Sequence, residues 1–486
     1  TWIGNTGNWD VQTNWSLGTI PKENHNVKIT GSSSKVTVPV AFLAVAKSLS
    51  VIDNSKLVNN GTITINTLNT FDGIYNNSSI TNVGTINISN TGGAGTVGQG
   101  INNFGLFDND GVIFMGPDIR ETGIWNRTGS TFNNNNEISF TGSITVCGID
   151  AVGGTFNNYG ILDNKANTGN AFILVSGSGK FFNHPCGIIN ETTSEQITAT
   201  HLVNSGIIRL KTSLPTTITS NSGVIANPNG SVISGTNTGS IITNSNTIVW
   251  TGCGQNGSTS NAANWVGLTS SQLADGNDHV IIPTGPMNTG NYPFHTGPGL
   301  NMTSTSIIEI NENASITFAD INGNAIQSAG VINLFGEIIV QHSSQNGIRI
   351  TNTGTLIGGA NSNITVMNVE QNAIRNDGMI NFSGSITTST NVGASGINNT
   401  NEFNLSGSGE IDIIGAEGVG IINNGDFNTS GNTSVYINAA LGGGFFNQDG
   451  GVVKNAGIMS INNVSNTAYL ELASSTFNNT GNLNLT

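Results

Sequence analysis

The chain has 486 residues, of which 65 are glycine and only 9% are charged. Its formal net charge of −14, from 28 acidic and 14 basic residues, argues against nucleic acid and anionic membrane surfaces as partners, because both require Lys/Arg patches. This composition is also typical of disorder, but the apolar residues are β-branched and periodic, so a long narrow core can be buried.

A tryptophan-rich segment opens the chain, with the sequence TWIGNTGNWDVQTNWS. We assign residues 1–30 to a Trp module that caps or joins repeat units, its indoles covering the end of the core. The alternative is a platform on which glycan rings stack. Its candidate structural or assembly residues are Trp2, Trp9, Asn14 and Trp15.

A short motif then recurs through residues 31–248, namely Asn, any residue, Gly and alternating apolar residues. The alternation predicts a half-buried strand, and we expect Asn-x-Gly to form a turn because both residues tolerate positive φ. One turn and one strand repeated many times predict a solenoid. Copies of the motif begin at Asn59, Asn82 and Asn204, and in the second half of the chain at Asn376 and Asn479.

The Trp module returns in residues 249–298, where VWTGCGQNGSTSNAANWV repeats the Trp-x-Gly and Asn-Trp pattern. The chain therefore contains two tandem units of about 248 residues each, by this spacing. Its structural or assembly candidates are Trp250, Asn264 and Trp265. The segment Pro283–Pro298 contains four of the ten prolines, which predicts a loop at the entry to the second solenoid, residues 299–486.

A second marker, a small residue followed by Ile or Phe, gives the period of the repeat. A step near 24 residues predicts one coil of a three-sided, right-handed parallel β-helix, and roughly 20 coils for the whole chain. Leucine-rich repeats are excluded because their Leu-x-x-Leu-x-Leu frame is absent. Ankyrin and TPR units are excluded because the sequence lacks helical periodicity. We also expect recurring asparagines to form side-chain ladders between coils. In the second unit the marker falls at Ala325-Ile326, Gly347-Ile348, Ala373-Ile374, Gly396-Ile397, Gly420-Ile421 and Gly444-Phe445.

Candidate catalytic groups are few. In the pairs Asp108/Asp110 and Glu410/Asp412, two acidic residues lie close together in the sequence. Because no Lys/Arg cluster accompanies them, we interpret them as turn and surface residues. The six histidines and three cysteines show no metal-ligand spacing. The sequence therefore predicts no catalytic, cofactor-binding or metal site.

The Trp-x-Gly…Asn-Trp-Ser segment, with its following Pro-containing loop and Val-x-Ile strand, resembles a recurring module of repetitive bacterial surface proteins. The Asn-x-Gly-x-Ile-x-Ile coils resemble the β-helical stalks of filamentous haemagglutinin-like and autotransporter-type adhesins and of large secreted surface proteins of Bacteroidetes. This resemblance implies an extracellular, cell-surface location and no active-site residues.

The leading hypothesis is a non-enzymatic structural protein, a β-solenoid rod of a surface fibre or adhesin stalk. Its expected partners are copies of itself stacked end to end, or further repeats of a longer chain, together with surface glycans; no membrane insertion is expected. The alternative is a carbohydrate-binding or carbohydrate-cleaving β-helix, with stacked carboxylates and exposed aromatic residues on neighbouring coils. A third option is an ice- or mineral-binding face of threonine ladders.

Overall fold

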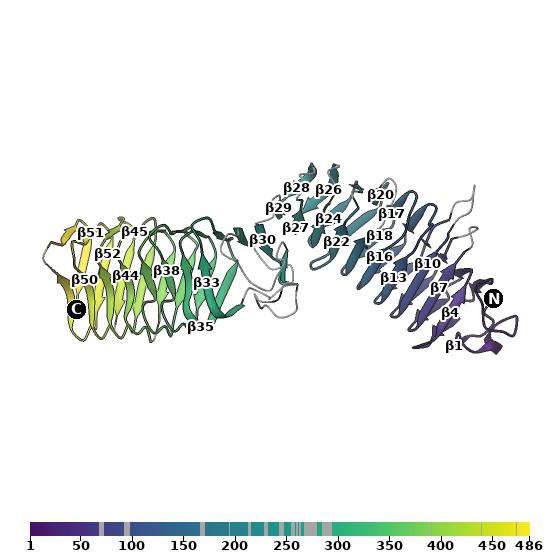
Figure 1. Ribbon diagram of the computed structural model, residues 1–486, viewed down its shortest axis with the longest axis horizontal. Helices are drawn as coiled ribbons and strands as arrows, with labels where there is room; N and C mark the ends of the chain where they lie inside the picture. Colours follow the sequence, from purple (N-terminus) through teal and green to yellow (C-terminus); the bar gives the residue numbers. More distant parts are fainter. Residues whose placement is uncertain are drawn as a thin grey trace. The chain divides into compact units, whose positions relative to one another are not determined.

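The computed structural model consists of two compact units, Thr1–Asn244 (unit 1) and Ser245–Thr486 (unit 2). Each unit is a stack of parallel strands (Figure 1), and most coils contribute one strand to each of three faces. The predicted all-β parallel solenoid is thereby confirmed. The structure describes all residues except 68–71, 92–97, 166–170, 194, 212–214, 228–231, 243–246, 254–257, 259–260, 262–263, 267–278, 284–293, 390, 439 and 473.

Unit 1 has three faces, named A, B and C in the order in which the chain visits them. Face A contains β2 (Asn26–Ile29), β5 (Ser48–Val51), β8 (Ile74–Asn76), β11 (Ile101–Asn103), β14 (Thr122–Asn126), β17 (Cys147–Val152), β20 (Ala171–Ser176) and β23 (Ile197–Ala199). Face B contains β1 (Thr6–Asn8), β3 (Lys35–Val38), β6 (Lys56–Asn59), β9 (Ser79–Asn82), β12 (Leu106–Asn109), β15 (Thr131–Asn134), β18 (Thr155–Asn158), β21 (Lys180–Asn183) and β24 (Leu202–Asn204). Face C contains β4 (Leu43–Ala46), β7 (Thr62–Asn66), β10 (Thr85–Ser89), β13 (Val112–Met115), β16 (Glu137–Phe140), β19 (Ile161–Asn164), β22 (Ile188–Glu191), β25 (Ile207–Arg209), β27 (Val224–Ala226) and β29 (Ser240–Ile242).

Faces A and B merge at the C-terminal end of unit 1. Strand β26 (Thr216–Asn221) pairs with both β23 and β24, and its register against β28 (Ile233–Asn237) shifts between Thr217 and Ser220. The coils shorten at the same place, since the step from Asn183 to its partner Asn204 is 21 residues and the next step is 17. A coil of 17 residues has room for fewer corner residues, which explains why one longer strand replaces two.

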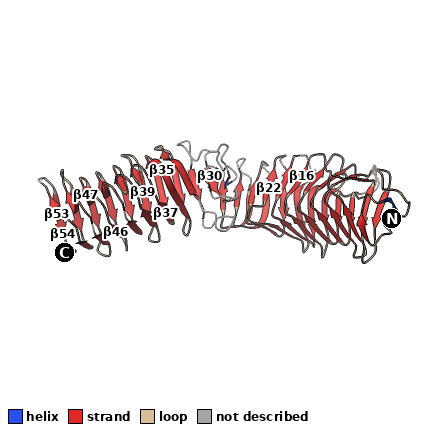
Figure 2. Cartoon of the chain, turned by 90° about the horizontal axis from the view of Figure 1, so that it is seen from below, coloured by secondary structure: helices blue, strands red, loops and turns tan. Residues whose placement is uncertain are grey.

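Unit 2 follows the same order of faces, and strands dominate both units (Figure 2). Face A contains the second half of β35 (Ser315–Ser328), β38 (Ile348–Ile350), β41 (Ile374–Asn376), β44 (Ser395–Asn399), β47 (Val419–Asn423), β50 (Gly443–Asn447) and β53 (Thr467–Glu471). Face B contains β30 (Thr247–Trp250), β32 (His279–Ile282), β34 (Ile307–Ile310), β36 (Val331–Leu334), β39 (Thr355–Gly358), β42 (Met379–Phe382), β45 (Glu402–Leu405), β48 (Asp426–Thr429), β51 (Val452–Asn455) and β54 (Thr476–Asn479), with β31 (Trp265–Val266) antiparallel to β30. Face C contains the first half of β35, β37 (Glu337–Val340), β40 (Asn363–Val366), β43 (Ser385–Thr388), β46 (Glu410–Ile414), β49 (Ser434–Asn438), β52 (Ile458–Asn462) and β55 (Asn482–Leu485).

The loop predicted for Pro283–Pro298 is wrong in its last part. Residues 284–293 lie outside the described residues, but β33 (Phe294–Met302) already forms a strand parallel to β35. Its register shifts twice, between His295 and Gly297 and between Pro298 and Leu300. Such irregularities accommodate a proline, which cannot donate to the ladder.

Alternating side chains build one apolar core in each unit. In β7, Ile63 and Ile65 are buried while the residues on either side of them are half-exposed. Each inward residue pairs in register with its counterpart one coil away, as Ile63 does with Ile86. Four phenylalanines on face B of unit 1 extend this stacking, with nearly parallel rings and centroids 4.6–4.9 Å apart: Phe107, Phe132, Phe156 and Phe181.

The small-residue marker identifies one column of the solenoid. In unit 2, Ile326 pairs with Ile348 and Ile348 with Ile374, and the column continues through Ile397 to Ile421. These residues all lie on face A, so the period near 24 residues predicted from the marker is confirmed.

The predicted asparagine ladder is present at the corner between faces B and C of unit 1. In every step the Nδ2 of one Asn donates to the Oδ1 of the Asn one coil later, at 2.7–2.8 Å. The Oδ1 atom also accepts the backbone N–H two residues on, as Gly61 donates to Asn59 at 3.2 Å. The ladder therefore closes each corner and joins it to the next coil. Its members are Asn59, Asn82, Asn109, Asn134, Asn158, Asn183, Asn204, Asn221 and Asn237.

The positive φ expected for Asn-x-Gly is wrong. Neither Asn59 nor Gly61 has a positive φ, and the same holds for Asn82 and Gly84. Glycine is needed because a Cβ on Gly84 would lie 1.9 Å from the carbonyl oxygen of Gly61, one coil away. Coil stacking, and not turn conformation, selects the glycine.

The motif copies also occupy two corners instead of one. Asn59, Asn82 and Asn204 end strands of face B, as does Asn479 in unit 2. Asn376 ends β41 on face A, where it donates to Asn399 at 2.7 Å. The same local sequence suits both corners because each needs an amide ladder and a residue without a Cβ.

Candidate functional site

The Trp module of unit 1 is an integral part of its core. The ring centroids of Trp2 and Trp15 lie 5.1 Å apart, and those of Trp9 and Trp15 lie 4.8 Å apart, both edge to face. The three indoles are at most 3% exposed, and Trp15 Nε1 donates to the Trp9 carbonyl at 2.8 Å. Asn14, which ends the 3₁₀ turn η1 (Gln12–Asn14), donates its Nδ2 to the Asn8 carbonyl at 3.2 Å.

Unit 2 repeats this arrangement at its own beginning. Trp250 pairs with Trp265 in antiparallel register, as Trp2 does with Trp15, and their ring centroids lie 4.9 Å apart. Asn264 is buried and donates its Nδ2 to the Ser258 carbonyl at 2.9 Å. These indoles are at most 2% exposed.

The buried indoles of both modules present no open aromatic face on which a sugar ring could stack. They pack instead against the cores of their own units, to which all five belong. The tryptophans of both Trp modules thus belong to the apolar cores of the units. Their role in covering the core ends stays a prediction.

The two carboxylates of the acid pair in unit 1, Asp108 and Asp110, accept hydrogen bonds from asparagines of the next coil. Asn133 Nδ2 donates to Asp108 Oδ1, and Asn135 Nδ2 donates to Asp110 Oδ1, each at 2.7 Å. Asn157 Nδ2 in turn donates to Asn133 Oδ1 at 2.8 Å. Asp108 therefore terminates a surface amide ladder, and Asp110 accepts a single side-chain amide.

The acid pair in unit 2 faces outward from β46. Glu410 is exposed and Asp412 is half-buried, and burial raises the pKa of Asp412. The residues paired with Asp412 on the neighbouring coils are Thr387 and Tyr436. No carboxylate stacks directly above or below Asp412, so the pair lacks the arrangement expected of a carbohydrate-cleaving groove.

A denser polar cluster, which sequence reasoning missed, lies on the outer side of face A in unit 1. Tyr75, Asn102, Trp125 and Asp150 follow one another in register on β8, β11, β14 and β17. The Arg127 guanidinium lies over the Trp125 ring and 5.1 Å from the centroid of the Phe104 ring. We call Asp72, Tyr75, Gln99, Asn102, Phe104, Glu121, Trp125, Arg127 and Asp150 the Arg127 cluster.

Hydrogen bonds link three coils within the Arg127 cluster. Arg127 Nε donates to Asn102 Oδ1 at 3.2 Å, and Asn102 Nδ2 donates to Asp72 Oδ2 at 2.8 Å. Gln99 donates its backbone N–H to Asp72 Oδ1 at 3.0 Å and its side-chain amide to Glu121.

The electrostatics of the Arg127 cluster favour protonated carboxyl groups. Burial raises the pKa of Asp150 to about 6, against the opposing charge of Arg127. Burial and the charge of Asp72 raise the pKa of Glu121. Asp150 Oδ1 and Trp125 Nε1 are buried atoms without a hydrogen-bond partner in the protein. A carboxyl group such as that of Asp150 can donate a proton near pH 6.

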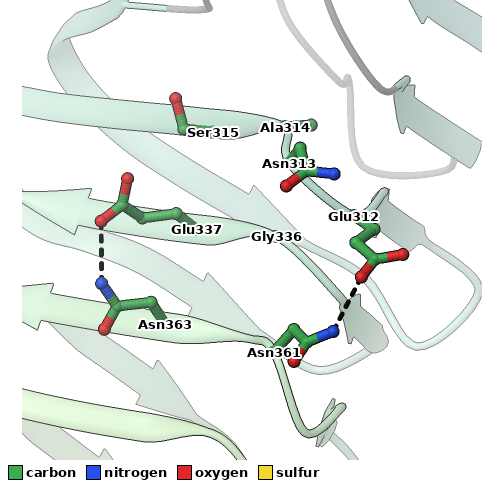
Figure 3. A pocket seen from close by; sticks show the side chains of 8 residues that line it. All are labelled: Glu312, Asn313, Ala314, Ser315, Gly336, Glu337, Asn361 and Asn363. Carbon is green, nitrogen blue, oxygen red and sulfur yellow. Dashed lines mark hydrogen bonds between the residues drawn. The ribbon is translucent and has the colours of Figure 1, made fainter.

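The second site that sequence reasoning missed is a hollow of about 370 Å³ at the corner between faces B and C of unit 2. Glu312 Oε1 accepts from Asn361 Nδ2 at 2.7 Å, and Glu337 Oε1 accepts from Asn363 Nδ2 at 2.9 Å. The two hydrogen-bonded pairs stand on opposite sides of the hollow (Figure 3). We call it the corner hollow; its lining residues are Glu312, Asn313, Ala314, Ser315, Gly336, Glu337, Asn361 and Asn363.

A second hollow of about 360 Å³ adjoins the first and shares Glu312 and Asn361 with it. Its distinctive residue is Phe335, which is 44% exposed. A Cβ on Gly359 would lie 3.0 Å from Phe335 Cδ1, so the ring rests against the backbone of the next coil. Three successive coils supply these residues, whose approach depends on coil length and could not be read from the motif.

Comparisons with known proteins add no function. No protein-family model matches the chain, and no curated protein matches its sequence. Among the described residues, no group of three or more His, Cys, Asp or Glu side chains is arranged to hold a metal ion. Within the same described ranges, no helix has the length and apolar character needed to cross a bilayer.

Proposed function

We propose that this chain is an extracellular structural protein, a β-solenoid segment of a bacterial surface fibre or adhesin stalk. The observation that carries the proposal is the use of the recurring residues. In unit 1, eight amide bonds join nine asparagines into one ladder, and the accompanying glycines allow the coils to approach. Residues that repeat in every coil thus hold the coils together, as a load-bearing or spacing element requires.

The proposal includes growth along the solenoid axis. Parallel strand edges at the end of a coil stack can pair with the strands of a further coil, from the same chain or from another copy. A Trp module is the expected partner because the two described ones already lie at the beginning of a coil stack.

Electron microscopy of the producing cells, with antibodies against this chain, tests the proposal. We expect label along surface fibres, and the same antibodies should detect the protein in material sheared from intact cells. Label confined to the cytosol, or only isolated soluble monomers outside the cell, would contradict the structural role.

A second candidate function, carbohydrate cleavage, is favoured by the Arg127 cluster. It combines two carboxyl groups of raised pKa, those of Glu121 and Asp150, with the Trp125 side chain, which is in register with Asp150 on the neighbouring coil; a raised pKa suits a general acid. Screening neutral and acidic polysaccharides for reducing-end release tests it. Polysaccharide cleavage that is abolished by Asp150→Asn or Glu121→Gln would favour this function. If the unaltered chain cleaves none of the polysaccharides, the structural role is the one remaining proposal.

A further inference from the structure

We propose that the corner hollow and the adjoining hollow of unit 2 together bind a neutral saccharide. The inference does not depend on the structural role, because a solenoid can carry a lateral binding site without using its ends. It rests on an exposed aromatic ring beside planar hydrogen-bonding groups, gathered into a concave surface from three coils. Each hollow, at about 370 and 360 Å³, lies in the lower range of small-ligand sites.

The aromatic side of the site is Phe335. Its ring is 44% exposed, and its contact with Gly359 holds it in place. An exposed ring supported from behind offers a flat apolar surface at little entropic cost. The axial C–H groups of a pyranose present a matching apolar face.

The polar side consists of the Glu312–Asn361 and Glu337–Asn363 pairs. Glu312 and Glu337 each accept an amide N–H, from Asn361 and Asn363. A carboxylate can accept several hydrogen bonds, and an amide that donates one N–H has a carbonyl acceptor and a second N–H as well. Sugar hydroxyl groups donate and accept at once, so they suit paired acceptors and donors. The hydrogen bonds within each pair orient all four side chains before a ligand arrives.

Charge selects a neutral sugar over an acidic one. The lining residues include two carboxylates and no Lys or Arg, so uronic acids would meet like charge. A cationic peptide would gain from the carboxylates and from the face of the Phe335 ring, but its ammonium groups could accept no hydrogen bond from the Asn361 and Asn363 amides. We therefore infer a neutral saccharide as the ligand class.

Calorimetric titration of the full chain with neutral hexasaccharides tests the inference. The panel contains β-1,4-glucose, β-1,4-N-acetylglucosamine, α-1,4-glucose and α-1,6-mannose oligomers, with oligogalacturonate and hexalysine as charged comparisons, all in the presence of EDTA. We expect one neutral oligomer to bind. Phe335→Ala should weaken that binding roughly five- to tenfold, and Glu312→Gln roughly tenfold.

Phe114→Ala is the matched control, because Phe114 is 37% exposed on face C of unit 1 and is not a lining residue of the hollows. It should leave the affinity unchanged, and circular dichroism should show that all variants keep their strand content. Binding to none of the neutral oligomers would overturn the proposal. So would preferential binding of oligogalacturonate or hexalysine, or an affinity that Phe335→Ala leaves intact. Fibre labelling by microscopy is unaffected by any of these outcomes.

Discussion

At the scale of single residues, the recurring Asn and Gly owe their positions to contacts between coils. Sequence reasoning predicted where they occur and that asparagines form ladders. It assigned the wrong cause to the glycine, because a turn preference is visible in one copy of the motif whereas a carbonyl from another coil is not. Gly84 and Gly425 illustrate this, since neither has a positive φ and both lie under a carbonyl oxygen.

The glycine argument predicts opposite outcomes for two neighbours in unit 2. A Cβ on Gly425 would lie 2.0 Å from the Asn401 carbonyl oxygen, whereas one on Gly431 would lie 3.9 Å from its nearest atom, the Ala456 oxygen. Gly425→Ala should therefore lower the free energy of unfolding by at least about 1 kcal/mol. Gly431→Ala should leave it nearly unchanged. Urea denaturation followed by circular dichroism measures both; equal effects would contradict the stacking argument.

The ladder argument predicts that one missing amide affects two coils. Asn158→Ala removes the acceptor of Asn134 Nδ2 and the donor to Asn183 Oδ1, both buried. Leaving a buried polar group unpaired costs about 1–3 kcal/mol, so unit 1 should lose at least that much stability. Asn136→Ala, on the exposed surface of the same unit, serves as the control and should cost far less in the same denaturation experiment.

The pH dependence of unit 1 should include a contribution from Asp150. Its folded pKa of about 6 lies above the usual value near 3.8, so the folded state binds this proton more tightly than the unfolded state. The resulting stabilisation is complete below pH 4 and is lost as the pH rises through 6. Asp150→Asn should remove this fall, so that the variant gains stability relative to the parent between pH 4 and 7.

Thermal unfolding at a series of pH values measures that difference. Asp118→Asn, which changes an exposed carboxylate of the same unit, is the control. A parent and an Asp150→Asn protein whose stabilities run parallel from pH 4 to 7 would show that the folded pKa of Asp150 is not raised.

At the scale of strands and coils, the period and the assignment of residues to the core were predictable, and the position of each corner was not. The marker at Ile374 and Ile397 gave face A directly, because an inward column needs the same residue class in each coil. The corner hollow depends on side chains from three coils, and its register follows from coil lengths that vary by several residues. No local pattern contains that information.

One ion-pair arrangement ties neighbouring coils of unit 2 together. Arg349 and Arg375 lie in register on β38 and β41, and both donate to Asp377, at 3.3 and 3.1 Å. The Asp377 side chain is only 11% exposed. Asp377→Asn should therefore cost about 1–2 kcal/mol, above the usual value for surface pairs, because two stacked guanidinium groups lose a shared counterion.

The control for that prediction is Asp163→Asn. Asp163 pairs with Lys165 at a shorter distance of 2.7 Å, but the Lys165 side chain is 54% exposed. We expect a loss of about 0–0.5 kcal/mol there. Chemical denaturation of both variants shows whether burial or ion-pair distance determines the loss in the free energy of unfolding. A larger loss for Asp163→Asn than for Asp377→Asn would contradict the argument.

At the scale of the whole molecule, each unit is a sequence of nearest-neighbour contacts between coils. The two units were predictable from the duplicated Trp segments, and their division at Asn244 and Ser245 lies within a few residues of the expected boundary. The Arg127 cluster and the corner hollow were not predictable, because their residues lie outside the repeated motif. The repeated motif indicates which residues hold the coils together, but it gives no information on sites formed by residues outside the motif.

Distances between spin labels along face B of unit 1 test the stacked-coil account most directly. Pairings in register connect Lys35 to Lys180 through five intermediate strands. With labels introduced as unnatural amino acids at exposed Lys35, Lys56 and Lys180, pulsed dipolar spectroscopy should give about 29 Å for the first and last positions and about 24 Å for the last two. The separation should thus grow by one strand spacing for each coil. Distances that do not follow the number of coils would contradict the parallel solenoid on which the whole account depends.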